Sequence, residues 1–121
     1  DLDSTEILDV ANMSFVPGPR MGTRRNFCAT VMLQESRLLI FGGSHGSNSL
    51  ESTEVLDLAT LTFSPGPRMC TWRSGCAAAM LDPDHMLVLG GFDGCSHLDT
   101  TEVLDLPAMS FTPGPRMGTW R

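Results

Sequence analysis

The sequence predicts an all-β fold made of repeated four-stranded antiparallel units, and two observations support this prediction. A similar segment occurs three times, at residues 5–25, 53–73 and 101–121, and successive copies begin 48 residues apart. The second and third copies are identical at 15 of 21 positions. Each full unit also contains four short apolar or alternating runs separated by Gly- and Pro-containing turns, a pattern typical of strands. No segment keeps the apolar spacing of an amphipathic helix.

The four runs of each unit can be assigned in chain order. In the first full unit we expect strands at Asn26–Leu33, Leu38–Phe41, Thr53–Leu58 and Leu61–Ser64. In the second we expect them at Ser74–Leu81, Met86–Leu89, Thr101–Leu106 and Met109–Thr112. The first strand carries small side chains that suit a crowded central axis, and the second is apolar throughout, as expected if both of its faces are covered. The fourth ends in proline, which an edge strand tolerates.

A period of 48 residues lies in the range of propeller blades. The chain then divides into a half repeat at 1–25, which holds the two outer strands of a blade, and full repeats at 26–73 and 74–121. All three would belong to one propeller domain. A closed propeller takes at least about four blades, so one copy of this sequence does not close. Either the chain is a piece of a longer propeller, or several copies associate to complete the ring.

Composition and charge exclude several classes of protein. The net charge is −6 and every cation is arginine, which argues against a nucleic-acid partner. No apolar run approaches the roughly 18 residues of a membrane span, so we expect no membrane partner. The four cysteines follow no disulfide pattern, which favours a reducing compartment and a cytoplasmic location.

Three segments carry a resemblance to a known family. Leu87–Gly94 reads LVLGGFDG, Ser96–Leu106 reads SHLDTTEVLDL, and Arg73–Leu81 reads RSGCAAAML. With the apolar strand ending in Gly-Gly and the later strand ending in Asp, the unit resembles the kelch repeat. It looks most like the propellers of kelch-like ubiquitin-ligase adaptors. The sequence departs from that pattern where Leu-Asp replaces Tyr-Asp and where phenylalanine replaces the tryptophan of the outer strand.

This resemblance implies a non-catalytic scaffold that binds proteins. In kelch-like adaptors the arginine of the Arg-Ser-Gly motif lies at the mouth of the central channel and can hold acidic peptide groups. The matching position here is Arg73, with Arg25 and Arg121 in register one repeat away. The resemblance therefore implies a protein or acidic peptide as partner.

The chain geometry of a blade also places several polar and aromatic residues together. The loops Ser44–Glu51 and Phe92–Asp99 and the links between repeats should emerge on one face. Arginine and tryptophan are enriched at the energetically dominant positions of interfaces. The candidate partner-binding residues are Arg24, Arg25, Arg73, Arg121, Trp72, Trp120, His45, Asp93 and His97.

Some of these residues have an equally simple structural explanation. A side chain that recurs in every repeat can serve the scaffold, and Arg20, Arg68 and Arg116 are expected to pair with acids such as Glu54 or Glu102. Arg25, Arg73 and Arg121 are open to either role, and Trp72 and Trp120 could pack between blades. Residues that do not repeat should carry specificity, which favours Arg24, His45, Asp93, Cys95 and His97.

The sequence offers no complete catalytic constellation, so we expect no enzyme, cofactor or metal. The Gly-Gly pairs lack the Lys-Ser/Thr of a phosphate-binding loop, and they suit a tight exit from a buried strand. Cys95 and His97 match no zinc spacing. The alternative to a binding scaffold is a structural propeller held in a larger or self-assembled complex.

Overall fold

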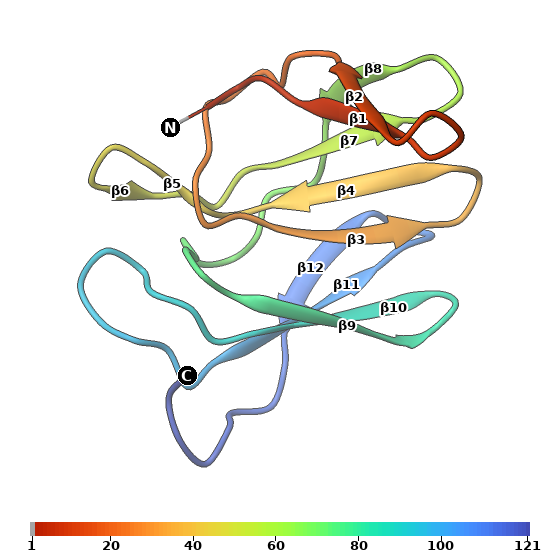
Figure 1. Ribbon diagram of the computed structural model, residues 1–121. Helices are drawn as coiled ribbons and strands as arrows, with labels where there is room; N and C mark the ends of the chain where they lie inside the picture. The colour runs from red at the N-terminus through yellow and green to blue at the C-terminus, as the bar shows by residue number, and fades with distance from the viewer. Residues whose placement is uncertain (1) are drawn as a thin grey trace.

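The computed structural model describes residues 2–121 and has two four-stranded antiparallel sheets stacked face to face (Figure 1). The first sheet runs in the order β3 (Ala29–Leu33), β4 (Arg37–Phe41), β7 (Thr53–Asp57) and β8 (Thr62–Pro65). The second runs in the order β9 (Ala77–Asp82), β10 (His85–Leu89), β11 (Thr101–Asp105) and β12 (Ser110–Pro113). The prediction of an all-β fold made of four-stranded antiparallel units is confirmed, and the described residues form no closed propeller.

The two sheets share one register, as the sequence repeat requires. Leu38 lies opposite Leu56 in the first sheet, and Met86 lies opposite Leu104 in the second, 48 residues later in both strands. The outer strand follows a tight turn after Asp57, whose side-chain Oδ1 accepts hydrogen bonds from the next backbone amides. Such Asx turns explain why aspartate ends the third strand of each unit.

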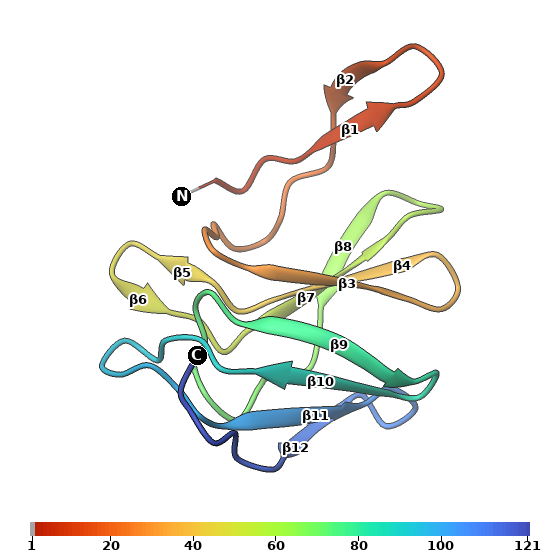
Figure 2. The same cartoon turned by 60° about the horizontal axis from the view of Figure 1, so that its bottom comes forward.

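The core lies between the two sheets. Leu39 and Phe41 of β4 face Met86 and Val88 of β10 and Leu104 of β11, and all five are fully buried. This face-to-face packing is visible in Figure 2, where β3 and β9 lie next to each other. Burial of such side chains stabilises the fold by about 1.5–3 kcal/mol each. The adhesion between repeats is therefore mainly apolar.

The half repeat forms a separate hairpin of β1 (Glu6–Asp9) and β2 (Ser14–Pro17). In Figure 2 this hairpin stands away from the first sheet. An apolar cavity of about 550 Å³ lies between them. Its lining includes Ile7 and Met21 from the half repeat and Ile40, Leu56 and Phe63 from the sheet. The near face of the first sheet is thus only partly covered.

A short hairpin of β5 (Ser44–His45) and β6 (Asn48–Ser49) was not expected from the sequence. It follows Gly42 and Gly43, which both have positive φ angles of 63° and 90°. Gly43 donates its amide hydrogen to the carbonyl of Arg73, and an added Cβ at Gly42 would overlap that carbonyl. The Gly-Gly pair therefore lets the strand exit pack directly against the link that enters the next repeat.

Candidate functional site

Loops and links gather at one end of the two sheets, which we call the loop face. It comprises the loops 44–52 and 92–100 and the links 18–26, 66–74 and 114–121. In Figure 1 the β5–β6 hairpin and the C-terminus lie at this end, and the tight turns of the main hairpins lie at the other. All nine candidate binding residues lie in these loops and links, although not all of them reach the surface.

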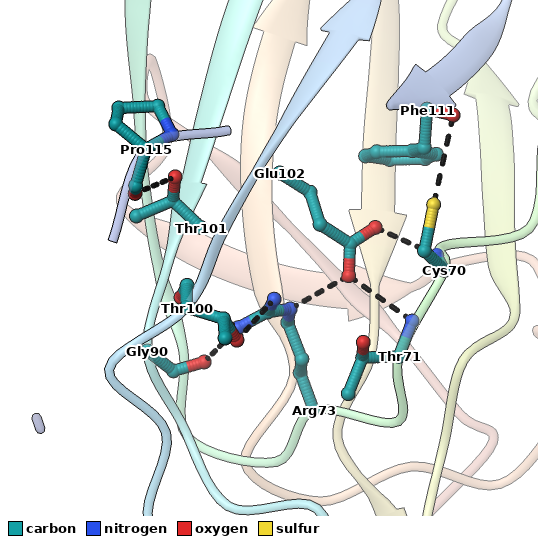
Figure 3. Close-up of polar contacts among 9 residues, drawn as sticks. All are labelled: Cys70, Thr71, Arg73, Gly90, Thr100, Thr101, Glu102, Phe111 and Pro115. Carbon is teal, nitrogen blue, oxygen red and sulfur yellow. Dashed lines mark hydrogen bonds and ion pairs between the residues drawn. The ribbon is translucent and has the colours of Figure 1, made fainter. Parts of the chain in front are cut away.

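Arg73 lies beneath the loop face, in a buried ion pair with Glu102 of the next repeat. The Arg73 side chain is 0% exposed and that of Glu102 is 2% exposed, and 2.9 Å separates Arg73 Nε from Glu102 Oε1. The guanidinium also donates to the carbonyls of Gly90 and Thr100 and to the Thr100 hydroxyl (Figure 3). The carboxylate accepts two further bonds from the amides of Cys70 and Thr71 (2.6 and 3.1 Å).

The same network occurs one repeat earlier. Arg25 pairs with Glu54 at 3.1 Å and donates to the carbonyls of Gly42 and Ser52. Glu54 also accepts from the amide of Gly22 at 2.5 Å. A buried charge is tolerated only when it is paired and hydrogen-bonded, and both conditions hold here. Arg25 and Arg73 therefore join successive repeats inside the molecule instead of presenting their charge to a partner at the surface.

A second arginine of each link forms an outer ion pair. Arg20 pairs with Asp3, Arg68 with Glu51 and Arg116 with Asp99. The prediction that these arginines pair with Glu54 or Glu102 is therefore wrong. Those glutamates are buried against the other arginine of the link, and the outer arginines are about three-quarters exposed. The outer pairs link the loop before the third strand to the segment after the fourth.

Six of the predicted residues remain exposed on the loop face. Arg24, Trp72 and Trp120 occupy the same position of three successive links, and Trp72 and Trp120 are 55% and 61% exposed. His45, His97 and Arg121 are also exposed, and Asp93 is half-buried. Within residues 2–121, Arg24 and Arg121 form no side-chain ion pair or hydrogen bond. They are the exposed cations of the loop face that have no ion-pair partner within the described residues, unlike Arg20, Arg68 and Arg116.

The two tryptophans have different surroundings. The Trp120 ring stacks on the imidazole of His97, with centroids 5.2 Å apart and an interplanar angle of 22°. The centroid of the same imidazole lies 5.3 Å from the centroid of the Phe92 ring. Trp72 instead lines a cavity of about 410 Å³ between the loops of the two repeats. Trp120 thus stacks on an imidazole of its own chain and Trp72 borders an unfilled cavity, although the two side chains are similarly exposed, at 61% and 55%.

Asp93 lies at the edge of the Trp72 cavity. Its Oδ1 accepts hydrogen bonds from the amides of Ser96 and Cys95, both at 2.8 Å. These bonds favour the charged carboxylate and lower the pKa of Asp93 below its ordinary value. The group is therefore an anion at neutral pH, in an orientation fixed by its own loop.

The cysteines do not form a metal site. Cys70 is exposed and its Sγ lies 3.6 Å from the Phe111 carbonyl, while Cys95 is exposed in the loop. Burial raises the pKa of the Cys76 thiol to about 11, so it remains protonated at neutral pH. Among residues 2–121, no group of three or more His, Cys, Asp and Glu residues could hold a metal ion.

Sequence reasoning overlooked two features of this face. Glu54 and Glu102 follow Arg25 and Arg73 by the same distance of 29 residues, but Glu51 and Asp99 recur with an equally constant spacing, so the repeat did not single out the buried pairs. The contacts of His97 with Phe92 and Trp120 had no such signal, because serines occupy the equivalent positions of both His97 and Phe92 in the preceding repeat.

A scan against protein-family models matches the kelch motif twice, at residues 24–69 and 73–118. Together these segments cover most of the chain. The chain belongs to the kelch-repeat family. Each match contains one of the four-stranded sheets described above. Kelch repeats generally serve as protein-interaction modules and are commonly non-catalytic.

No curated protein matches this kelch chain. The described residues contain no helix long and apolar enough to cross a membrane. The two family matches identify repeat units, and no catalytic domain is identified by them.

Proposed function

We propose that this kelch chain is a non-catalytic scaffold whose loop face binds a partner protein. The observation that carries the proposal is the exposure of Trp72 and Trp120 on one face, with the exposed Arg24 at the equivalent position of the preceding link. Large apolar surface left in water is characteristic of interaction sites, and tryptophan and arginine dominate the binding energy of interfaces. The resemblance of the repeats to adaptor propellers supports partner recruitment over catalysis, and the four free cysteines support a cytoplasmic location.

A preference for acidic groups would rest on Arg24 and Arg121. Arg25 and Arg73 are buried, and the outer arginines already have carboxylate partners. An acidic side chain of a partner would then approach the two ends of the loop face, where neither cation forms an ion pair within the described residues. The pKa of Asp3 is nevertheless lowered by its hydrogen bond with Arg20 and, to a smaller extent, by the charge of Arg24. The tryptophans between them would supply apolar contact area.

The test is selection of binders from a library of random 12-residue peptides displayed on phage, followed by affinity measurements on the selected peptides. We expect the double variant Trp72→Ala/Trp120→Ala to weaken binding by at least about tenfold, as for a hot-spot side chain. Arg24→Glu should select against peptides with acidic residues. Charge reversal at Arg73 would be a poor test because it would place an unpaired charge in the core. Peptides that bind the tryptophan variant as well as the natural chain would contradict the proposal.

The second candidate is a structural role in a larger or self-assembled propeller. It is favoured by the apolar cavity beside the half repeat, which leaves part of a sheet face uncovered. Two exposed charges also favour this role. Glu6 occupies the repeat position of the buried Glu102, and Arg121 occupies that of the buried Arg73, yet both are exposed. The molar mass of the 121-residue chain in solution tests self-assembly. A well-folded monomer at micromolar concentration would exclude assembly of this chain with itself.

A further inference from the structure

The two full repeats provide an internal comparison for the environment of a loop-face tryptophan. Trp72 and Trp120 are equivalent, as are Ser49 and His97. In the second repeat the imidazole of His97 stacks on the Trp120 ring at 5.2 Å. In the first repeat the equivalent side chain is a serine, which is too small to cover the ring. The position filled by a planar ring in one repeat is therefore open in the other.

The opening at Trp72 has defined walls. Its lining comes from residues 47–49 of the first repeat and from Asp93, Gly94 and Cys95 of the second, around a volume of about 410 Å³. The hydroxyl of Ser49 donates to the carbonyl of Phe92 at 3.0 Å and ties the two loops together. The walls are thus held in place by a hydrogen bond between repeats.

Charge decides which planar group fits this opening. Asp93 contributes an anionic carboxylate, and its Oδ2 makes no hydrogen bond within the described part of the chain. No cationic side chain lines the cavity. A guanidinium group stacks on aromatic faces through its flat surface and donates paired hydrogen bonds to a carboxylate. Lysine offers a point charge without the flat surface, and an acidic side chain would be repelled by Asp93.

We propose that the cavity beside Trp72 binds an arginine side chain of the partner protein, with its guanidinium stacked on the indole and paired with Asp93. This rests on the proposed function, since it assigns one contact within the partner-binding loop face. The cations Arg24 and Arg121 belong to other links, so a partner that carries both an arginine and an acidic group can use both kinds of contact.

The test uses capped tripeptides Gly-Arg-Gly, Gly-Lys-Gly and Gly-Glu-Gly as probes. The chain has two tryptophans, so its indole Nε1–H resonances report on the two environments separately. We expect Gly-Arg-Gly to shift the Trp72 resonance and leave that of Trp120 in place. Gly-Lys-Gly should bind at least about twofold more weakly because it cannot stack. Gly-Glu-Gly should produce no shift. Equal shifts with the arginine and glutamate peptides would overturn the proposal.

Two further variants, the first with a matched control, sharpen the result. Ser49→His should place an imidazole over Trp72, as His97 does over Trp120, and abolish binding. Ser49→Ala also loses the hydrogen bond to the Phe92 carbonyl but leaves the cavity open, so it should weaken binding much less than Ser49→His does. Asp93→Asn can still accept the loop amides but loses the charge, and should weaken binding by about twofold to fivefold, the range of an exposed ion pair. Binding that survives Ser49→His would overturn the proposal.

This outcome is separable from that of the proposed function. If the arginine peptide leaves Trp72 unshifted while library peptides still require the two tryptophans, the arginine site is refuted and the loop-face scaffold stands. If library peptides bind without the tryptophans and the arginine peptide still shifts Trp72, the cavity is an arginine site and the wider binding face is refuted.

Discussion

Arg68 and Arg73 lie five residues apart in one link, and each is paired with a glutamate. Arg68 and Glu51 lie at the surface, while Arg73 and Glu102 are enclosed between two repeats. Water and counter-ions screen the first pair, so its contribution should be small. Removal of one partner from the second pair leaves an uncompensated charge inside the protein. The same chemical interaction should therefore differ several-fold in its effect on stability.

The first prediction compares these two arginines. Arg73→Met should lower the free energy of unfolding by about 3–5 kcal/mol, because it strands Glu102 in the core. Arg68→Met should lower it by at most about 1 kcal/mol. Urea denaturation followed by tryptophan fluorescence measures both. Equal losses in the two variants would contradict the assignment of Arg73 as the main polar connection between repeats.

The second prediction concerns His85 at the tight turn between β9 and β10. Its Nδ1 lies 2.9 Å from Asp82, and this hydrogen bond raises the pKa of His85 above its ordinary value of 6.5. A histidine with a raised pKa in the folded state contributes stability that is fully present below pH 6.5. That contribution is lost as the pH rises through the raised value.

An NMR titration of the His85 ring protons measures this effect. In Asp82→Asn the carboxylate is absent, so the pKa of His85 should fall towards 6.5. The difference in unfolding free energy between the natural chain and this variant should shrink as the pH rises above that value. An unchanged His85 pKa in the variant would show that Asp82 does not stabilise the imidazolium.

The strands were largely predictable because the pattern of each strand occurs twice in the sequence, once in each full repeat. The predicted runs agree with β3 to β12 to within a few residues, apart from the β5–β6 hairpin. That hairpin contains only two residues per strand and has no apolar alternation to reveal it. The partners of buried arginines were not predictable from residue type alone, since Glu51 and Glu54 are both near enough in sequence to pair with an arginine of the link.

The third prediction concerns how β4 joins the next link. Gly42 and Gly75 have φ angles of 63° and 66°, so alanine at either position costs about 1–2 kcal/mol in backbone strain. At Gly42 the added Cβ would also overlap the Arg73 carbonyl, whereas at Gly75 it meets nothing within 4 Å. Gly42→Ala should therefore cost a further 1–3 kcal/mol or so, as for overpacking.

Thermal and urea unfolding of the two variants measure the difference. Gly75→Ala serves as the control, since it changes the same backbone preference without the steric overlap. If both variants lose the same stability, the close contact between the Gly-Gly exit and the Arg73 carbonyl does not constrain the junction of the repeats.

At the scale of the whole molecule, the repeats explain both the packing and its incompleteness. The face of the first sheet that meets the second is built from Leu33, Leu39, Phe41, Val55 and Met69. In the half repeat, Ile7 and Met21 stand in register with Val55 and Met69 and line the 550 Å³ cavity. The described residues contain no counterparts of the other three. The cavity thus corresponds to an inner hairpin with the pattern of β3–β4.

The fourth prediction follows from this correspondence. A fusion of residues 26–52 directly in front of Thr5 would keep the 48-residue period and supply a second copy of the β3–β4 hairpin. The added β4 should pair with the free edge of β1, and its Leu39 and Phe41 should fill the cavity. We expect a higher urea midpoint and weaker fluorescence of a hydrophobic dye, because apolar area is removed from water. The same fusion with both of these side chains changed to aspartate is the control, since it adds the chain length without the apolar contacts. A fusion that gains nothing over this control would show that the cavity is not the place of a missing inner hairpin, and that the half repeat packs in its own way.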